Sequence, residues 1–157
     1  MRNKKKKVRI LLPPDADPTG EELFRLSNSS YPQGSPWSKK LFENDKKDSY
    51  SGYGLIIKDG KTVGYIGYRQ VFEEAEITNL AIVKEEQKHG LAVELVEKWL
   101  EKMKKEQVEI VFLEVRYSNQ AAVKLYKKMG FQQVAVRKNY YQNPIEDAII
   151  LNYIIEK

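Results

Sequence analysis

Residues 79–92 read Asn79-Leu80-Ala81-Ile82-Val83-Lys84-Glu85-Glu86-Gln87-Lys88-His89-Gly90-Leu91-Ala92. The pattern from residue 76 to 83 is typical of a β-strand, and after residue 86 the apolar residues take a helical spacing. A strand that enters a helix through a glycine loop leaves unpaired backbone N–H groups at the helix start, and such groups bind anions. The segment therefore predicts an anion site at residues 87–92, where Gly90 lets a ligand approach the backbone closely.

Single helices interrupt a series of strands on both sides of this segment. We predict strands at 8–12, 53–58, 62–70, 76–83, 110–115, 131–137 and 148–155. We predict helices from 17 toward 27, at 39–44, after residue 86 and at 119–129. An apolar stripe marks the third helix and consists of Leu91, Leu95, Val96, Trp99, Leu100 and Met103. This order favours a mixed sheet covered by helices on both faces, which is an α/β (α+β) architecture.

The composition limits the kinds of site that the chain can build. Its 157 residues, 41% of them hydrophobic, suit one domain, which we place at residues 8–157. The sequence has no Cys and one His, which excludes thiol nucleophiles, disulfides and zinc–thiolate sites, and we expect no metal. No apolar run approaches the roughly 20 residues that span a bilayer. We therefore expect a cytoplasmic protein that does not contact membranes.

The positive charge is concentrated at the start of the chain. Six of the 27 Lys and Arg residues lie within the first nine positions, and the remaining 21 face 22 Asp and Glu. We interpret residues 1–7 as a flexible basic arm, because runs of like charge are usually solvated. A weak contact of this arm with nucleic acid on the ribosome stays open as an alternative, since cationic segments attract phosphates.

Further motifs follow the glycine loop in a fixed order. They are Leu113-Glu114-Val115-Arg116-Tyr117-Ser118-Asn119, Leu125-Tyr126-Lys127-Lys128-Met129-Gly130-Phe131, Asn139-Tyr140-Tyr141 and Glu146-Asp147-Ala148, with Ser35-Pro36-Trp37-Ser38 upstream. With these motifs the chain resembles the GCN5-related N-acetyltransferase (GNAT) superfamily and, within it, the RimI-type ribosomal-protein-alanine N-acetyltransferases. The resemblance covers most of the chain. It implies the GNAT fold, with a mostly antiparallel mixed sheet, and acetyl-CoA as the cofactor.

The resemblance also implies roles for particular residues. Glu114 would be the general base and Tyr126 the general acid, which are the two groups that amide formation from a thioester requires. Cofactor contacts would come from Leu80, Ala81 and Ile82 along the pantetheine arm, from Gln87, Lys88, His89, Gly90, Leu91 and Ala92 at the pyrophosphate, and from Asn119. Two alternatives stay open. In the first, Glu114 is a polar residue at a solvated strand end, and in the second, Tyr126 is a core tyrosine with a structural hydrogen bond. Glu114 can also act directly or through a water.

The acceptor is expected to be a protein N-terminus. A protein α-amine has a reference pKa near 8 and a lysine amine one near 10.4, so the α-amine is already partly neutral at physiological pH. The resemblance narrows the acceptor to the N-terminal alanine of a small-subunit ribosomal protein, acetylated by direct transfer. A polyamine, an aminoglycoside or a lysine side chain remains an alternative acceptor. A non-catalytic acyl-CoA-binding module is the alternative from another class.

Four residues are expected to contact the acceptor peptide. We place Tyr140 and Tyr141 between the last two strands, where two aromatic rings can wall a narrow slot. Trp37 would close the opposite wall or anchor the core, and Arg116 would be a peptide-site or supporting group. We expect a monomer or a weak dimer.

The chain departs from the family pattern in the glycine loop. Family members usually carry more basic residues at the positions of Lys88, His89 and Val93. We therefore expect backbone N–H groups, more than side-chain charge, to hold the pyrophosphate. Tyr117 also stands where the family tends to have a small residue, which bears on the peptide preference.

Overall fold

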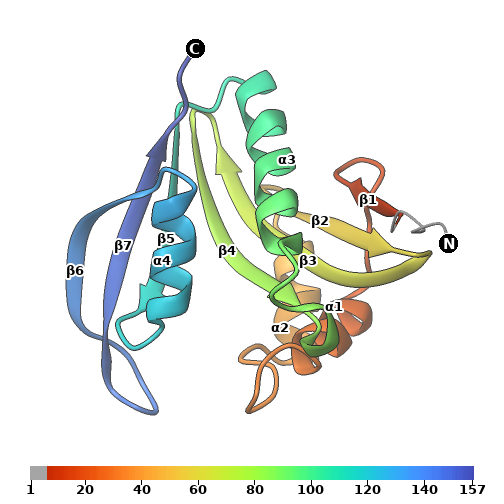
Figure 1. The fold of residues 1–157 in the computed structure, drawn as a ribbon, viewed down its shortest axis with the longest axis horizontal. Helices are drawn as coiled ribbons and strands as arrows, with labels where there is room; N and C mark the ends of the chain where they lie inside the picture. The colour runs from red at the N-terminus through yellow and green to blue at the C-terminus, as the bar shows by residue number, and fades with distance from the viewer. Residues whose placement is uncertain (1–6) are drawn as a thin grey trace, which may run out of the picture.

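The computed structural model describes residues 7–157, which form one seven-stranded sheet with helices on both faces (Figure 1). The strands are β1 (Val8–Leu11), β2 (Ser51–Lys58), β3 (Lys61–Val71), β4 (Glu74–Ile82), β5 (Ile110–Arg116), β6 (Gln132–Tyr141) and β7 (Glu146–Ile154). The helices are α1 (Gly20–Asn28), α2 (Lys39–Lys46), α3 (Leu91–Lys105) and α4 (Gln120–Lys128), with a short 3₁₀ helix, η1 (Lys84–Glu86).

The sheet is mixed but mostly antiparallel, with the strand order β1-β2-β3-β4-β5-β7-β6. Within residues 7–157, β4 and β5 form the only parallel pair. A parallel pair needs a crossover connection, and α3 supplies it. The predicted fold class is confirmed.

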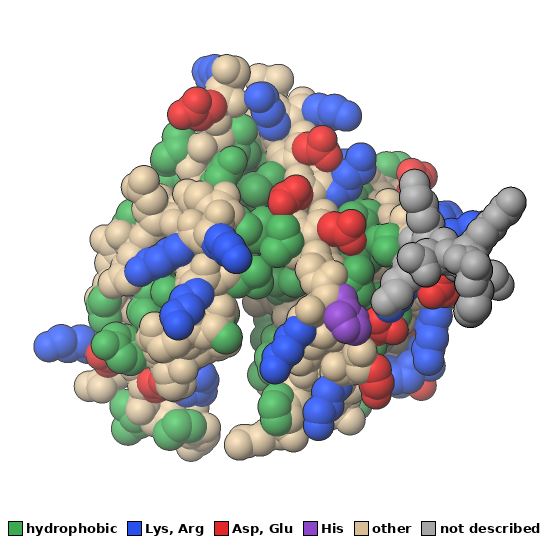
Figure 2. Space-filling view, viewed as in Figure 1, with side chains coloured by type: hydrophobic (Ala, Val, Ile, Leu, Met, Phe, Trp, Pro, Cys, Tyr) green, Lys and Arg blue, Asp and Glu red, His purple; other side chains and the backbone are tan. Residues whose placement is uncertain are grey.

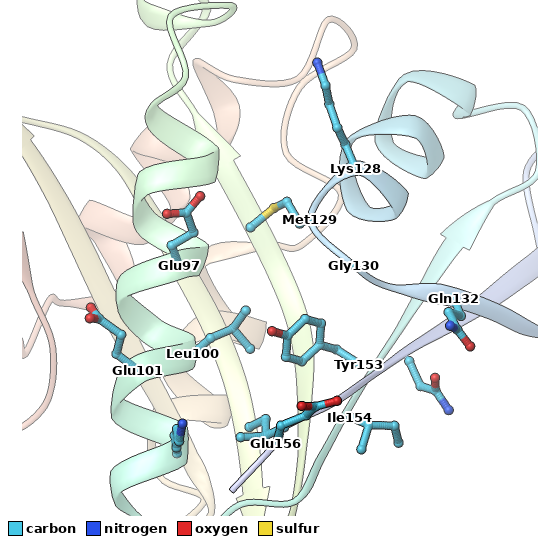
Figure 3. A pocket seen from close by; sticks show the side chains of 13 residues that line it. Glu97, Leu100, Glu101, Lys128, Met129, Gly130, Gln132, Tyr153, Ile154 and Glu156 are labelled. Atoms are coloured by element: carbon cyan, nitrogen blue, oxygen red, sulfur yellow. The ribbon is translucent and has the colours of Figure 1, made fainter.

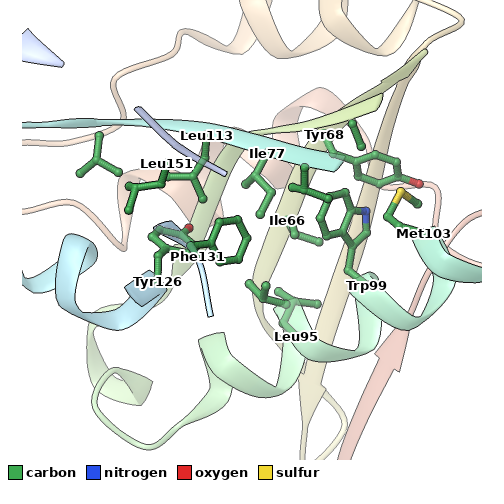
Figure 4. Close-up of a cluster of buried hydrophobic side chains, with 14 of the residues drawn as sticks. Ile66, Tyr68, Ile77, Leu95, Trp99, Met103, Leu113, Tyr126, Phe131 and Leu151 are labelled. Carbon is green, nitrogen blue, oxygen red and sulfur yellow. The ribbon is translucent and has the colours of Figure 1, made fainter. Parts of the chain in front are cut away.

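Neighbouring residues on one strand pack into different cores, because side chains alternate between the two faces of a sheet. Leu55 belongs to a cluster with Leu23 and Phe42 from α1 and α2, whereas Ile56 belongs to a cluster with residues of α3 and α4. In Figure 4 the α3 side chains point toward the strand residues of this second cluster. Trp99 is fully buried there. Helices therefore cover both faces.

The spacing of β4 and β5 decides where a ligand can enter the sheet. Their parallel pairing runs from Glu74 and Ile110 to Ile77 and Leu113 and then stops. The pairing of β3 with β4 shifts register at the same level, because Gly67 and Tyr68 pair with Asn79 and Ile77 and leave Thr78 of β4 as the extra residue of a β-bulge. Bulges bend a strand and increase its local twist. Residues 78–82 of β4 consequently have no strand partner on their β5 side within the described part of the chain.

Several predicted boundaries were wrong. Tyr140 and Tyr141 are the last residues of β6 and do not lie between the last two strands. The helix predicted to open at residue 17 begins at Gly20, because the Thr19 side chain caps it by accepting a hydrogen bond from the Glu22 N–H. The helix expected after residue 86 begins only at Leu91.

The basic arm falls almost entirely outside the described residues, since the structure describes nothing before Lys7. Lys7 itself is tied to the hairpin turn between β2 and β3. Its N–H donates to the Asp59 side chain at 3.2 Å, and its carbonyl accepts from the Asp59 N–H at 2.9 Å.

Candidate active site

A cleft of about 810 Å³ opens where β4 and β5 diverge. In the space-filling view it is the hollow at the lower edge, between the lobe that carries α4 and the lobe that carries α1 and α2 (Figure 2). Seven of the predicted site residues line it, namely Trp37, Leu80, Glu114, Arg116, Asn119, Tyr126 and Tyr141. The structure thus brings together residues from α4, three strands and the segment between α1 and α2.

Glu114 lies on β5 with its side chain 24% exposed. Side chains of the strand alternate, so that Val111, Leu113 and Val115 are buried in the core while Glu114 faces away from it. Its Oε1 lies 3.5 Å from Nη1 of Arg137 on β6. The Tyr140 hydroxyl also hydrogen-bonds to Glu114, and this bond is the main reason why the pKa of Tyr140 is raised. The carboxylate is therefore held at the cleft by two polar neighbours.

Tyr126 lies on the inward stripe of α4 and is 6% exposed. Its ring packs against Phe131 with 5.3 Å between centroids. Burial raises the pKa of Tyr126, and the neighbouring Tyr31 raises it further. A hydroxyl with a raised pKa keeps its proton at neutral pH, so Tyr126 is protonated at the cleft.

The start of α3 has unpaired backbone N–H groups where the sequence predicts an anion site. The first intrahelical bond runs from the Glu94 N–H to the Gly90 carbonyl, and no described side chain caps the helix. The N–H groups of Leu91, Ala92 and Val93 therefore lack intrahelical acceptors. Gly90 adopts a left-handed φ of +78°, and a Cβ built on it would meet no atom within 4 Å. The backbone is thus open to a ligand at this position.

Two side chains of the glycine loop are engaged within the protein. Gln87 donates from Nε2 to the carbonyls of Ile82 at 2.7 Å and Ser30 at 2.9 Å. His89 lies 3.7 Å from Glu86, which also pairs with Lys58. Gln87 therefore fixes the shape of the loop, and the exposed Lys88 is the loop's basic side chain without such a contact among the described residues.

Several predicted residues lie outside the cleft lining. The side chains of Ala81 and Ile82 are 4% and 7% exposed and point into the two cores, so only their backbone is available to a ligand. Residues 87–92 lie beyond the end of β4. Tyr140 is half-exposed on β6 and reaches the site through its hydrogen bond to Glu114.

Trp37 and Asn119 each have a structural contact besides their place in the cleft. Trp37 packs on Phe42 with 5.2 Å between ring centroids. It is therefore both a core anchor and part of the cleft wall. The Asn119 side chain accepts a hydrogen bond from the Ala122 N–H at 3.2 Å and caps α4.

Sequence reasoning missed three residues of the site. Tyr31 donates to the Leu80 carbonyl at 3.1 Å and lines the cleft. Asn79 accepts from the Tyr65 hydroxyl at 3.0 Å, while its buried Nδ2 has no partner among the described residues. Arg137 pairs with Glu114. The signal that the sequence offered for Asn79 was a polar residue directly before the apolar run of residues 80–83.

A second cavity, of about 770 Å³, lies between α3 and the end of β7 (Figure 3). Leu100 and Tyr153 contribute to it, with the charged residues Glu97, Glu101 and Glu156. It contains none of the predicted site residues, seven of which line the cleft between β4 and β5.

The match to a known family agrees with this geometry. The model of the acetyltransferase (GNAT) family matches residues 20–131. The chain belongs to this family and is an acetyl-CoA-dependent N-acetyltransferase. The open start of α3 and the free edge of β4 fit a cofactor with a diphosphate and an amide-containing arm. No group of three or more potential metal ligands occurs within residues 7–157.

Individual relatives are similar over most of the chain. The [ribosomal protein bS18]-alanine N-acetyltransferase of Escherichia coli (strain K12) is 36% identical over 118 residues, covering 74% of this chain and 79% of the relative. A Bacillus subtilis (strain 168) relative, assigned provisionally to the same activity, is 38% identical over 132 residues, covering 83% and 86%.

A solved structure is similar as well. The crystal structure of the ribosomal-protein-S18-alanine N-acetyltransferase from Escherichia coli superposes with a TM-score of 0.82 at 28% identity, covering 98% of this chain and 96% of the other. Among the described helices, none is long and apolar enough to cross a membrane.

Proposed function

We propose that this protein acetylates the N-terminal α-amine of a protein, specifically the alanine N-terminus of the small-subunit ribosomal protein bS18. The observation that carries the proposal is the convergence of Glu114 and Tyr126, from β5 and α4, on one cleft at the point where β4 and β5 separate. The relatives named for bS18-alanine acetylation support the acceptor. Residues 8–157 would act as one catalytic domain, in the cytoplasm where ribosomal proteins are made.

In this proposal Glu114 is the general base. A protein α-amine is partly protonated at neutral pH and must lose a proton to become a nucleophile. Glu114 accepts this proton directly or through a water. Arg137 and Tyr140 hold the carboxylate toward the cleft, so that an incoming ammonium group meets a fixed negative charge.

Tyr126 is the proposed general acid. Acetyl-CoA supplies the activated acetyl group as a thioester, and the departing thiolate needs a proton. Tyr126 holds a proton in the buried wall of the same cleft and donates it there. The resulting base and acid stand on separate elements, which allows a direct transfer without a covalent enzyme intermediate.

The remaining proposed roles concern binding. The free N–H groups at the start of α3 would hold the pyrophosphate, because a helix N-terminus carries a partial positive charge and unpaired donors. The backbone of Leu80, Ala81 and Ile82 would run along the pantetheine arm, and Asn119 would contact the cofactor beside it. Trp37, Tyr140 and Tyr141 would surround the acceptor peptide.

An acceptor panel tests the proposal. The protein is incubated with labelled acetyl-CoA and, separately, with alanine-initiated peptides, lysine peptides with blocked N-termini, a polyamine and an aminoglycoside. We expect the alanine-initiated bS18 peptide to react with the highest kcat/KM. Preferential acetylation of a lysine side chain or of a small amine would overturn the acceptor assignment, and no acetylation of any amine would leave only acyl-CoA binding.

A further inference from the structure

Arg116, the last residue of β5, directs its guanidinium group at the loop between β6 and β7. Nη1 donates to the Pro144 carbonyl and to Oε1 of Glu146, both at 3.1 Å, and Nη2 donates to the Gln142 carbonyl at 3.0 Å. Both terminal nitrogens are thus bound to the loop. The planar fork of arginine can meet several oxygens at once in this way.

The same guanidinium group stacks on an aromatic ring of the cleft. Its Cζ lies 4.5 Å from the centroid of the Tyr141 ring. Glu146 is held from the other side, since its Oε2 accepts from the Ser118 N–H. Hydrogen bonds from Ser118 and Arg116 accordingly lower the pKa of the Glu146 carboxyl. Arg116 therefore ties the loop to the end of β5 through both charge and packing.

The loop has few other restraints. Between the paired residues Tyr141 and Glu146, positions 142–145 are exposed. Arg116 is the only described side chain that hydrogen-bonds to the backbone of these four residues. The order of the loop therefore depends on one side chain.

The loop forms part of the wall of the candidate active site. Tyr141, Asn143, Pro144 and Glu146 line the same cleft as Glu114. The burial of Tyr141 and the nearby charge of Glu114 raise the pKa of the Tyr141 hydroxyl to about 12. Tyr141 and the proposed base therefore face the same cleft. The hairpin is visible at the lower left of the ribbon, beside β5 (Figure 1).

We propose that Arg116 is a positioning residue that sets acceptor affinity by holding the β6–β7 loop as a wall of the cleft. Its hydrogen bonds go to the loop, so it acts through Tyr141 and the loop backbone and does not touch the reacting atoms. The inference rests on the proposed function in one respect, that the acceptor N-terminus enters this cleft.

The first test separates acceptor binding from chemistry. Lysine keeps the charge of Arg116 but has no planar fork, so Arg116→Lys should raise the acceptor KM about tenfold or more. The kcat at saturating peptide and the KM for acetyl-CoA should stay within about twofold, because Glu114, Tyr126 and the α3 N-terminus are unchanged. A fall in kcat with an unchanged acceptor KM would overturn the proposal, since Arg116 would then act in the chemical step.

Arg69→Lys is the matched control. Arg69 also pairs with a carboxylate, Asp48, at 3.1 Å and lies 5.6 Å over the Tyr50 ring, but it does not line the cleft. Its replacement should leave the acceptor KM unchanged. Equal effects of the two substitutions would show a general loss of stability and would contradict a specific role of Arg116.

A second test needs no acceptor. Hydrogen exchange of the free protein should be about tenfold faster at the Ser118 and Glu146 amides in Arg116→Lys, and unchanged in Arg69→Lys. If exchange is faster in Arg116→Lys but the unaltered protein acetylates no peptide, the proposed function is wrong and the positioning of the loop by Arg116 still holds. Unchanged exchange would refute the positioning role whatever the acceptor. If Arg116→Lys does not fold, Glu146→Gln weakens the same contact from the loop side and should shift exchange in the same direction.

Discussion

The Glu114 carboxylate on β5 lies 3.5 Å from the Arg137 guanidinium on β6, although β7 separates the two strands in the sheet. Arg137 also lies 4.9 Å over the ring of Tyr140, which hydrogen-bonds to the same carboxylate. Two side chains of β6 therefore hold the proposed base on β5. These contacts explain how a partly exposed glutamate keeps one orientation at the cleft.

Glu114→Gln should lower kcat by about 10²–10⁴-fold, which is the usual contribution of a general base. The amide keeps the size of the side chain but cannot take up the proton of the acceptor amine. Acetyl-CoA affinity should not change, because the start of α3 is unaltered. Steady-state kinetics and a binding titration check both expectations.

Glu76→Gln is the control for this substitution. Glu76 is a carboxylate on the neighbouring strand β4, where partial desolvation and the charge of Glu114 raise the pKa of Glu76. It does not line the cleft. Its replacement should change kcat by less than about threefold. A larger loss of kcat in this variant than in Glu114→Gln would show that the base lies on β4 and not on β5.

Tyr126→Phe should lower kcat about 10²-fold or more and preserve both the fold and cofactor binding. The ring still packs against Phe131, and only the proton donor is lost. Tyr153→Phe provides the comparison, because the Tyr153 ring also packs on Phe131, with 5.2 Å between ring centroids, and does not line the cleft. Turnover of Tyr126→Phe equal to that of Tyr153→Phe would remove Tyr126 as the acid.

Gly90→Val should weaken acetyl-CoA binding about tenfold or more, because a β-branched side chain strains the left-handed backbone and covers the N–H groups at the start of α3. Lys88→Gln should weaken it only about two- to fivefold, the usual effect of one exposed charge at a helix terminus. Isothermal titration calorimetry measures both dissociation constants. The reverse ranking would show that side-chain charge holds the pyrophosphate.

Gly60→Val controls for backbone strain alone. Gly60 has a φ of +79°, and a Cβ on it also meets no atom within 4 Å, but it lies in the turn between β2 and β3. The two valine variants should lose similar stability. Only Gly90→Val should lose cofactor affinity.

The protein should lose stability at alkaline pH. Burial is the main reason why the pKa values of Tyr68 and Tyr141 are raised to about 12. The pKa of a tyrosine in an unfolded chain is near 10. Above about pH 10 the unfolded state therefore gives up protons that the folded state keeps, so the free energy of unfolding falls as pH rises through about 12. Urea denaturation at about pH 9 and about pH 11 measures the difference. Tyr68→Phe should reduce it, and a stability that does not change over this interval would contradict the assignment.

Local periodicity was enough to predict most of the fold. The apolar stripe of α3 predicted its buried face, and Leu95, Val96, Trp99 and Met103 are all buried. Boundaries failed where a side chain decided them, as when Thr19 set the start of α1.

The contacts that complete the site depend on tertiary structure. Arg137 reaches Glu114 because the last strand inserts between β5 and β6, and no pattern within one segment encodes this order. Tyr31 donates to the carbonyl of Leu80, 49 positions later in the sequence. The contacts of Arg116 were equally hidden, since two backbone carbonyls and the Glu146 carboxylate come from a hairpin that sequence alone does not place beside the end of β5.

The most direct test uses one peptide with two competing amines. A peptide copied from the alanine N-terminus of bS18, with an internal lysine, is acetylated by the full protein and fragmented by mass spectrometry, beside the same peptide with a blocked N-terminus. We expect the acetyl group on the α-amine of the first peptide, no reaction of the second, and loss of the product with Glu114→Gln. Acetyl-lysine in the first peptide with its α-amine left unmodified, or acetyl-lysine in the blocked peptide, would contradict the account.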